Sequence, residues 1–271
     1  MAVKLIAVDM DGTFLNDQKS YNRARFLKQY ERMKEQEIRF VVASGNQYYQ
    51  LISFFPEIAH EISFVSENGG WVVSEGRDVF NGELTPEEVQ TVLDHLQTLP
   101  WVQVITCGKH SGYTLASYDD AFKRMASHYY HRLEMVESFE NINDIFFKFA
   151  LNLPDDELLK TMDDLTTALE GIVVPVSSGH GSIDLIIPGV HKANGLRLLQ
   201  EQWGIRDEEV VTFGDGGNDV EMLRQAGYGF AMRNAPDRIK AVAPYQAPSN
   251  NDEGVLEIID QILDGKPPFD R

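Results

Sequence analysis

The chain has 271 residues, of which 43% are hydrophobic and 24% are charged, and its formal net charge is −18. This length allows one large domain or two, and the composition is typical of a soluble globular protein. Nucleic acids and anionic membranes attract concentrated positive charge, so the net charge argues against both as partners. A phosphate ester would need a local cation to offset the negative field of the protein.

The sequence also lacks the signals of membrane insertion and secretion. No stretch approaches the ~18 consecutive apolar residues that a membrane-spanning helix needs. The first residues enter an apolar run directly, without a secretory signal, so we expect a cytoplasmic protein. Cys107 is the single cysteine, which excludes an intramolecular disulfide and a thiolate-rich metal site. A lone cysteine in a β-rich run is more often buried than nucleophilic.

In the first part of the chain, predicted strands and helices alternate. Apolar runs predict strands at 3–8, 38–43 and 62–66, and helical spacing predicts helices at 21–36 and 47–55. This alternation favours a parallel sheet with right-handed crossovers. Two short β runs, 71–74 and 78–80, then predict a hairpin.

From about residue 83 the pattern changes. Thr85-Pro86-Glu87-Glu88 is typical of a helix start, with Thr85 as the cap and Glu88 completing a capping box. Helices are also expected near 120–129 and 155–169. Strands are predicted at 102–107, 113–116, 146–151, 172–177 and 183–187. Several strands with few helices indicate a mixed or antiparallel sheet, and therefore a second domain.

After Pro188-Gly189 the α/β alternation returns. The predicted elements are a helix at 193–203, a strand at 210–214, a helix at 220–225, a strand at 228–232 and a helix at 255–263. We therefore predict an α/β fold with a doubly wound, mostly parallel, Rossmann-like core. Residues 1–82 and 189–271 form this core, and an α/β domain of normal size is inserted at 83–188.

The first predicted strand runs into Asp9-Met10-Asp11-Gly12-Thr13. Parallel sheets place their ligands at the carboxyl ends of strands, and Gly12 lets the backbone turn there. Asp9 and Asp11 would point to opposite faces of a continuing strand. They can share one ion only if the chain turns, or if one of them uses its backbone carbonyl. Such oxygen ligands suit Mg²⁺, but an ordinary acidic strand-to-loop junction explains this pentapeptide equally well.

Three later segments could complete such a site. The strand at 210–214 runs into Asp215-Gly216-Gly217-Asn218-Asp219, and pairing with the first strand would bring Asp215 near Asp9. Ser44-Gly45-Asn46 precedes a helix, whose N-terminal N–H groups can hold a phosphate. Lys192 begins another helix, where the macrodipole disfavours a cation. Taken singly these are a glycine-rich turn, an N-cap and a solvated lysine. Together they favour a phosphate site.

Four segments resemble, in order, the motifs of the haloacid dehalogenase-like phosphatases: Asp9-Met10-Asp11-Gly12-Thr13, Ser44-Gly45, Lys192 and Gly214-Asp215-Gly216-Gly217-Asn218-Asp219. Segments 67–69, 230–235 and 250–255 look like secondary signatures of the Cof-like branch. Members of that branch carry a type IIB α/β cap domain between the second and third motifs, where the inserted domain is predicted. The resemblance covers essentially the whole chain, and segments 46–56 and 183–189 are similar to those of a sugar phosphatase of this branch.

Two positions depart from the branch pattern. Many members have Arg where this chain has Asn46, and Gly where it has Arg233. Loss of the first Arg removes a cation that could bind phosphate or substrate. Arg233 is expected to be a surface residue.

The resemblance implies a mechanism. Asp9 would be the nucleophile, and Asp11 would be the general acid and then the general base. Mg²⁺ would be held by the Asp9 side chain, the Asp11 carbonyl and the Asp215 side chain. The expected phosphate-binding residues are Ser44, Gly45, Asn46, Lys192 and Asn218, with Thr13 and Asp219 in support. The expected reaction is Mg²⁺-dependent hydrolysis of small phosphate monoesters, sugar phosphates above all, through an aspartyl-phosphate.

The cap should decide substrate specificity. Its candidate residues are polar side chains at strand ends: Lys148, Asn152, His180 and Asp184. Two other functions stay open, a phosphotransferase or phosphomutase on the same scaffold and a non-catalytic regulator that binds a phosphometabolite. Asp11 beside Asp9 argues against the regulator, because a pure binder has no use for an acid/base residue. The expected partner is a small phosphate ester, and the sequence predicts no oligomeric state.

Overall fold

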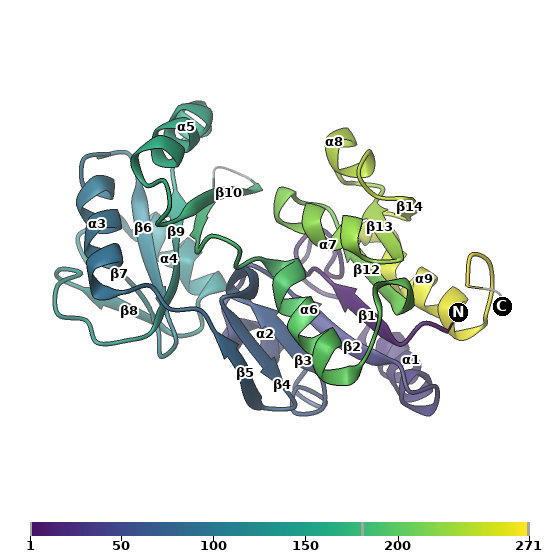
Figure 1. The fold of residues 1–271 in the computed structure, drawn as a ribbon. Helices are drawn as coiled ribbons and strands as arrows, with labels where there is room; N and C mark the ends of the chain where they lie inside the picture. Colours follow the sequence, from purple (N-terminus) through teal and green to yellow (C-terminus); the bar gives the residue numbers. More distant parts are fainter. Residues whose placement is uncertain (1, 180–181, 270–271) are drawn as a thin grey trace.

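The computed structural model describes residues 2–179 and 182–269, which form two separate sheets (Figure 1). The strands of the first sheet come from both ends of this region. In spatial order they are β14 (Tyr245–Ala247), β13 (Tyr228–Met232), β12 (Val210–Gly214), β1 (Leu5–Val8), β2 (Arg39–Ala43), β3 (Ser63–Ser66), β4 (Trp71–Ser74) and β5 (Arg77–Asn81).

The first sheet is parallel from β14 to β3, and the predicted hairpin of β4 and β5 adds an antiparallel edge. The strand order changes direction at β1, which pairs with β2 on one side and with β12 on the other. Ligands of doubly wound sheets bind at such a switch point, beyond the carboxyl ends of the strands. The residues that follow β1, β2 and β12 therefore meet at one edge of the sheet.

Helices cover both faces of this sheet. Ile6 and Val8 of β1 face a core built with α1 (Arg23–Glu35), α2 (Tyr48–Ser53) and α9 (Gly254–Leu263). Leu5 and Ala7 face α6 (Lys192–Trp203) and α7 (Val220–Gln225). Both faces of β1 are buried, as expected of a central parallel strand. The short α8 (Asp237–Lys240) packs beside α7.

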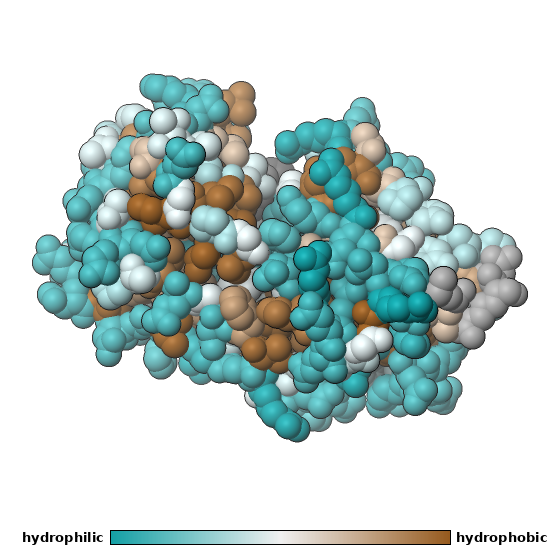
Figure 2. Space-filling model, viewed as in Figure 1, coloured by the Kyte–Doolittle hydropathy of each residue, from teal (hydrophilic) through white to brown (hydrophobic). Residues whose placement is uncertain are grey.

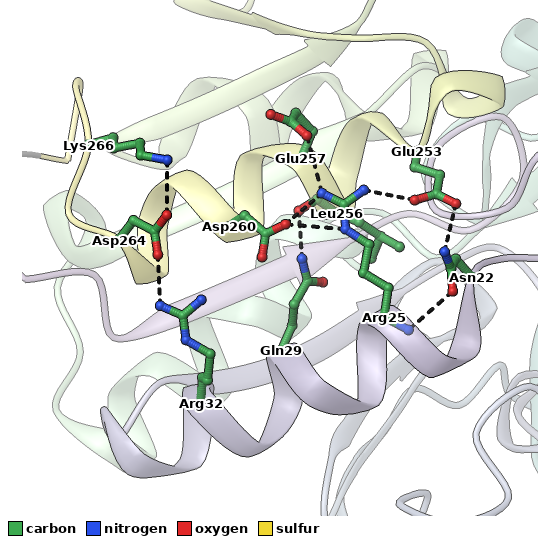
Figure 3. A network of polar contacts seen from close by, with 10 residues as sticks. All are labelled: Asn22, Arg25, Gln29, Arg32, Glu253, Leu256, Glu257, Asp260, Asp264 and Lys266. Carbon is green, nitrogen blue, oxygen red and sulfur yellow. Dashed lines mark hydrogen bonds and ion pairs between the residues drawn. The ribbon is translucent and has the colours of Figure 1, made fainter.

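Polar contacts join α1 to α9 across the surface (Figure 3). The Arg25 guanidinium lies 2.7 Å from Glu253 and 2.5 Å from Asp260, and the Gln29 amide donates to the Leu256 carbonyl at 2.7 Å. Exposed ion pairs contribute less than about 1 kcal/mol each. The apolar residues under these helices therefore supply most of the stability of this contact, and the ion pairs fix its register.

The second sheet belongs to the inserted domain. Its strands, in spatial order, are β10 (Val174–Gly179), β11 (Ser182–Ile186), β9 (Phe146–Asn152), β6 (Gln103–Gly108), β7 (Gly112–Leu115) and β8 (Leu133–Val136). The pairs are antiparallel except β7 with β8, so the sheet is mixed, as predicted. Helices α3 (Pro86–Leu96) and α5 (Leu158–Ala168) cover one face, and α4 (Asp120–Tyr129) covers part of the other.

These sheets confirm the predicted Rossmann-like core with an inserted α/β domain, and the capping box of Thr85 with Glu88 is present. The domain boundaries at 82/83 and 188/189 stay predictions. The elements that the sequence did not predict are short: β8, β14, α8 and the 3₁₀ turns Glu67–Gly69, Asp207–Glu209, Gly217–Asp219 and Asn250–Asp252. The helix predicted near 155–169 begins as a 3₁₀ turn, Asp155–Glu157, before α5. Three or four residues show no period of their own, so elements this short are predicted only where a turn signal marks them, as in the hairpin at 71–80.

Hydrophilic residues cover most of the face shown in Figure 2, and hydrophobic ones gather over the inserted domain and its junction with β4 and β5. A notch separates the inserted domain from α7 in this view. Among the described residues, no helix has the length and apolar character needed to cross a bilayer.

Candidate active site

Asp9 follows β1 and contacts a lysine from the other half of the core. Its Oδ1 atom accepts a hydrogen bond from Lys192 Nζ at 2.6 Å, and Lys192 also donates to Asp219 Oδ1 at 2.7 Å. The Lys192 side chain is 1% exposed, so the alternative of a solvated lysine is wrong. Burial alone would lower the pKa of Lys192, but the charges of Asp219 and Asp9 raise it above its usual value. The ammonium therefore stays charged inside the site.

Three carboxylates gather around this lysine. In the described part of the chain, Asp9, Asp215 and Asp219 each offer an oxygen within 4.8 Å of the others. Burial and the Asp219 charge raise the pKa of Asp9 well above its usual range, although Lys192 opposes them. The same two causes raise the pKa of Asp215 to about 6, against a hydrogen bond from Thr13 at 2.9 Å. A divalent cation would relieve this crowding, and oxygen ligands suit Mg²⁺.

Asp219 is already saturated by protein donors. Its Oδ2 atom accepts from the backbone N–H groups of Asp215 at 3.0 Å and Gly216 at 2.9 Å, and its Oδ1 atom accepts from Lys192. Asp219 therefore anchors the loop and the lysine. The carboxylates of Asp9 and Asp215 are better suited to hold a cation directly.

The chain turns at Gly12, as its position after Asp11 suggests. Gly12 has φ +76°, and a Cβ atom there would lie 2.4 Å from Asp215 Oδ2. Glycine is required at this point both by its left-handed backbone and by this close approach. The backbone after Asp11 therefore lies against Asp215, which places backbone oxygens of this turn beside the two carboxylates.

The Asp11 side chain points away from the carboxylate cluster. Its Oδ1 atom accepts from Lys19 Nζ at 2.5 Å and its Oδ2 atom from Asn46 Nδ2 at 2.7 Å. The two aspartates thus separate into two environments, as the alternation of a strand suggests. Lys19 was missed by the sequence analysis. It has φ 56° in a turn that is held by the Asn16 side chain, and no motif distinguished it from a surface lysine.

Ser44 and Gly45 lie in the turn after β2. Ser44 is buried, and its Oγ atom accepts from the Asn46 backbone N–H at 3.1 Å. The alternative of a helix N-cap at Ser44 is wrong, because α2 starts later and Gln47 is its N-cap. Asn218, in the 3₁₀ turn after Asp215, donates to Asn68 Oδ1 at 3.0 Å.

The structure places the four candidate specificity residues of the cap in different surroundings. Lys148 and Asp184 are buried against the core, where Lys148 donates to the Gly45 carbonyl and Asp184 accepts from Asn68. Asn152 lies at the other end of β9 and donates to Gln103 at 2.9 Å, within the cap. His180 lies outside the described residues. Arg233 is largely exposed and pairs with Asp252, as expected of a surface residue.

A family model described as haloacid dehalogenase-like hydrolase matches residues 6–259. The chain therefore belongs to this family, as its motifs suggest, and within the family it is a phosphatase.

The chain is 65% identical to the 5-amino-6-(5-phospho-D-ribitylamino)uracil phosphatase YbjI of Escherichia coli (strain K12), over 100% of both chains. It is 26% identical to the phosphatase YcsE of Bacillus subtilis (strain 168), which has the same substrate in its name, over 95% of this chain and 94% of the relative.

Solved structures share the fold. SMU.1108c from Streptococcus mutans UA159 has a TM-score of 0.93 and 37% identity, over 97% of this chain and 100% of that chain. The subclass IIB sugar phosphatase BT4131 has a TM-score of 0.82 over 96% of this chain and 98% of that chain. At 19% identity, BT4131 supports the fold alone.

Proposed function

We propose that this phosphatase hydrolyses phosphate monoesters of small polyhydroxylated alcohols, sugar phosphates among them, with Mg²⁺ as cofactor and Asp9 as nucleophile. The observation that carries the proposal is the contact of the Asp9 carboxylate with buried Lys192 inside a cluster of acidic oxygens. The names of two relatives support a polyol ester, because a phosphorylated ribityl group is a sugar-alcohol chain. The first compound to test is therefore 5-amino-6-(5-phospho-D-ribitylamino)uracil.

In the first step, an Asp9 oxygen attacks phosphorus while the ester P–O bond breaks. Asp11 gives a proton to the departing alcohol oxygen, which leaves as the neutral alcohol. Lys192 stays charged and lies 2.6 Å from Asp9, so it favours the ionised nucleophile against the burial that raises the pKa of Asp9, and it offsets phosphoryl charge. Ser44, Gly45, Asn46 and Asn218 surround the phosphoryl group. Asp9 and Asp215, with the Asp11 carbonyl, would hold Mg²⁺, which would supply positive charge to offset that of the phosphoryl group.

In the second step, water attacks the aspartyl-phosphate. Asp11, now ionised, takes a proton from that water, and the P–O bond to Asp9 breaks to release inorganic phosphate. Lys19 and Asn46 donate to the two Asp11 oxygens at 2.5 and 2.7 Å. These contacts fix the orientation of the Asp11 carboxylate, outside the cluster of Asp9, Asp215 and Asp219. The different surroundings of Asp9 and Asp11 match their different roles.

The test is phosphate release from a panel of sugar phosphates, nucleotides and phosphorylated cofactor precursors, with and without Mg²⁺. We expect Mg²⁺-dependent release, fastest for esters of open-chain or cyclic polyols. A parallel reaction with an unphosphorylated sugar acceptor detects transfer. Phosphoryl transfer to the acceptor in place of release would indicate a phosphotransferase or phosphomutase. Binding without turnover would indicate a regulator.

A further inference from the structure

Lys148 and Asp184 lie on neighbouring strands of the cap and share one face of its sheet. Lys148 of β9 is opposite Ile186, and Asp184 of β11 is opposite Ala150, so the two charged side chains are diagonal neighbours. Both residues are buried, at 1% and 5% exposure. Buried charges of this kind are stable only when they are paired and hydrogen-bonded.

The partners of Lys148 come from both domains. Its Nζ atom lies 2.8 Å from the Gly45 carbonyl oxygen, 3.0 Å from Asp184 Oδ2 and 3.4 Å from Glu67 Oε2. Burial alone would lower the pKa of Lys148, but Asp184 and Glu67 raise it, so the ammonium stays charged. The Gly45 contact is a hydrogen bond and the two carboxylate contacts are ion pairs; Glu67 Oε2 accepts no hydrogen bond from the described residues. All three neighbouring oxygens belong to the protein, so this buried ammonium is directed at the protein and away from a leaving group.

Asp184 extends the contact to a second loop of the core. Its Oδ2 atom accepts from Asn68 Nδ2 at 2.6 Å, and Asn68 Oδ1 accepts from Asn218 Nδ2 at 3.0 Å. A chain of polar contacts therefore runs from the cap to the turn directly after Asp215. We call Lys148, Asp184, Glu67, Asn68 and Asn218 the interdomain network.

The core loop in this network has an unfavourable backbone. Glu67 and Asn68 have φ of 51° and 56°, a left-handed region that is unfavourable for non-glycine residues unless their surroundings hold them there. A Cβ atom at Gly45 would lie 3.1 Å from the Asn68 amide and 3.2 Å from Asp184 Oδ2. The cap carboxylate, the strained loop and the Ser44-Gly45 turn thus pack directly together.

The contact with the Gly45 carbonyl has a consequence for the general acid. A peptide group is planar, so holding this oxygen also fixes the backbone of Asn46. The Asn46 side chain donates to Asp11 at 2.7 Å. Lys148 therefore orients the residue that holds Asp11, and Asp184 orients Asn218 through Asn68.

We propose that Lys148 and Asp184 are positioning residues, which complete the phosphoryl-binding loops of the core when the cap is docked, and that they do not read the leaving group. This inference rests on the proposed function. It predicts that the two residues affect the hydrolysis of every phosphate ester to the same extent, because the loops that they orient contact the phosphoryl group and Asp11. A residue that reads the leaving group would affect only substrates with the matching alcohol.

The experiment compares Asp184→Asn, Lys148→Met and Lys148→Arg with the wild-type protein. kcat and KM are measured for 4-nitrophenyl phosphate and for the best polyol phosphate of the panel, with thermal unfolding as a check of the fold. Gln90→Ala is the control, because it changes an exposed polar side chain of α3 in the cap, whose hydrogen bond to Asp94 stays within that helix.

We expect Asp184→Asn and Lys148→Met to lower kcat/KM by the same factor for both esters, about 10- to 100-fold. Lys148→Arg should recover part of the loss, and Gln90→Ala should leave the hydrolysis of both substrates unaffected. If Lys148→Met fails to fold, Asp184→Asn, which keeps the shape of the side chain, and Lys148→Arg still decide the question.

A loss of kcat/KM confined to the polyol phosphate would show that these residues recognise the leaving group, and it would overturn the inference. If the wild-type protein is active and Asp184→Asn hydrolyses both esters at the wild-type rate, the inference is overturned but the proposed function is not. A wild-type protein that releases phosphate from neither ester would overturn the proposed function, and the inference with it.

Discussion

Lys192 Nζ lies 2.6 Å from Asp9 Oδ1, although 183 residues separate them in the chain. Lys192 is the first residue of α6, where the helix dipole is unfavourable for a cation. Asp9 and Asp219 supply the negative charge that stabilises it there. Because α6 packs against Leu5 and Ala7 of β1, the packing of this helix on the sheet brings the pair together.

Replacing Asp11 should separate the two chemical steps. 4-Nitrophenolate leaves without protonation, so Asp11→Asn should still form the aspartyl-phosphate from 4-nitrophenyl phosphate. Without a base for the attacking water, its hydrolysis should slow by about 10²- to 10⁴-fold. Rapid-mixing kinetics should show a burst of one 4-nitrophenolate per enzyme and then slow turnover. Linear release at the wild-type rate would contradict the role of Asp11. Asp237→Asn, at a fully exposed site, is the control.

Mg²⁺ should stabilise the folded protein through Asp215. A ligand that binds only the folded state adds about 2.7 kcal/mol at 100 times its Kd. We expect a Mg²⁺-dependent rise in Tm for the wild-type protein, reversed by EDTA and lost in Asp215→Asn. Without metal, Asp215→Asn should be at least as stable as wild type, because burial and Asp219 raise the pKa of Asp215 to about 6. An equal Mg²⁺ response in both proteins would refute a metal ligand at Asp215.

Glu67 should make stability fall as pH rises. Burial raises its pKa from the ordinary 4.5 to about 7, against the lowering effect of Lys148. Between these values the folded protein binds more protons than the unfolded chain, so the free energy of unfolding decreases with increasing pH. Relative to wild type, Glu67→Gln should gain on the order of 3 kcal/mol across this window. Urea unfolding at several pH values measures the difference, and a difference independent of pH would rule out this titration.

Gly12 can be compared with Gly171, which has a similar backbone conformation but no atom close to the position of a Cβ. Gly12 and Gly171 have φ of +76° and +82°. A Cβ atom at Gly12 would lie 2.4 Å from Asp215, whereas one at Gly171 would have no atom within 4 Å. Alanine in a left-handed conformation costs about 1–2 kcal/mol, so both substitutions should lower stability. Gly12→Ala should also abolish phosphate release, whereas Gly171→Ala should not. Equal activity of the two variants would contradict the close approach at Asp215.

Most of the core could be predicted from the sequence because its strands are continuous apolar runs that end in turn signals. The predicted helices 120–129 and 220–225 and the strands 210–214 and 228–232 match the structure to the residue. The proximity of Asp9 to Asp215 followed from strand order, since carboxyl ends of parallel neighbours meet.

The missing parts of the site depend on contacts that leave no pattern in the sequence. Lys19 reaches Asp11 through a turn with a left-handed residue, and Asn68 reaches Asp184 across two domains and 116 positions. Lys148 appeared as a polar residue on a cap strand, but alternation alone could not show that its face packs against the Gly45 carbonyl. Strand periodicity gives the face of a residue, and the docking of the domains decides its partner.

Whether Asp9 carries the phosphoryl group can be decided by the rate at which Asp9→Asn hydrolyses 4-nitrophenyl phosphate with saturating Mg²⁺. We expect a loss of at least ~10³-fold in kcat, with the fold intact by circular dichroism. Hydrolysis at the wild-type rate by a folded Asp9→Asn protein would contradict this role of Asp9.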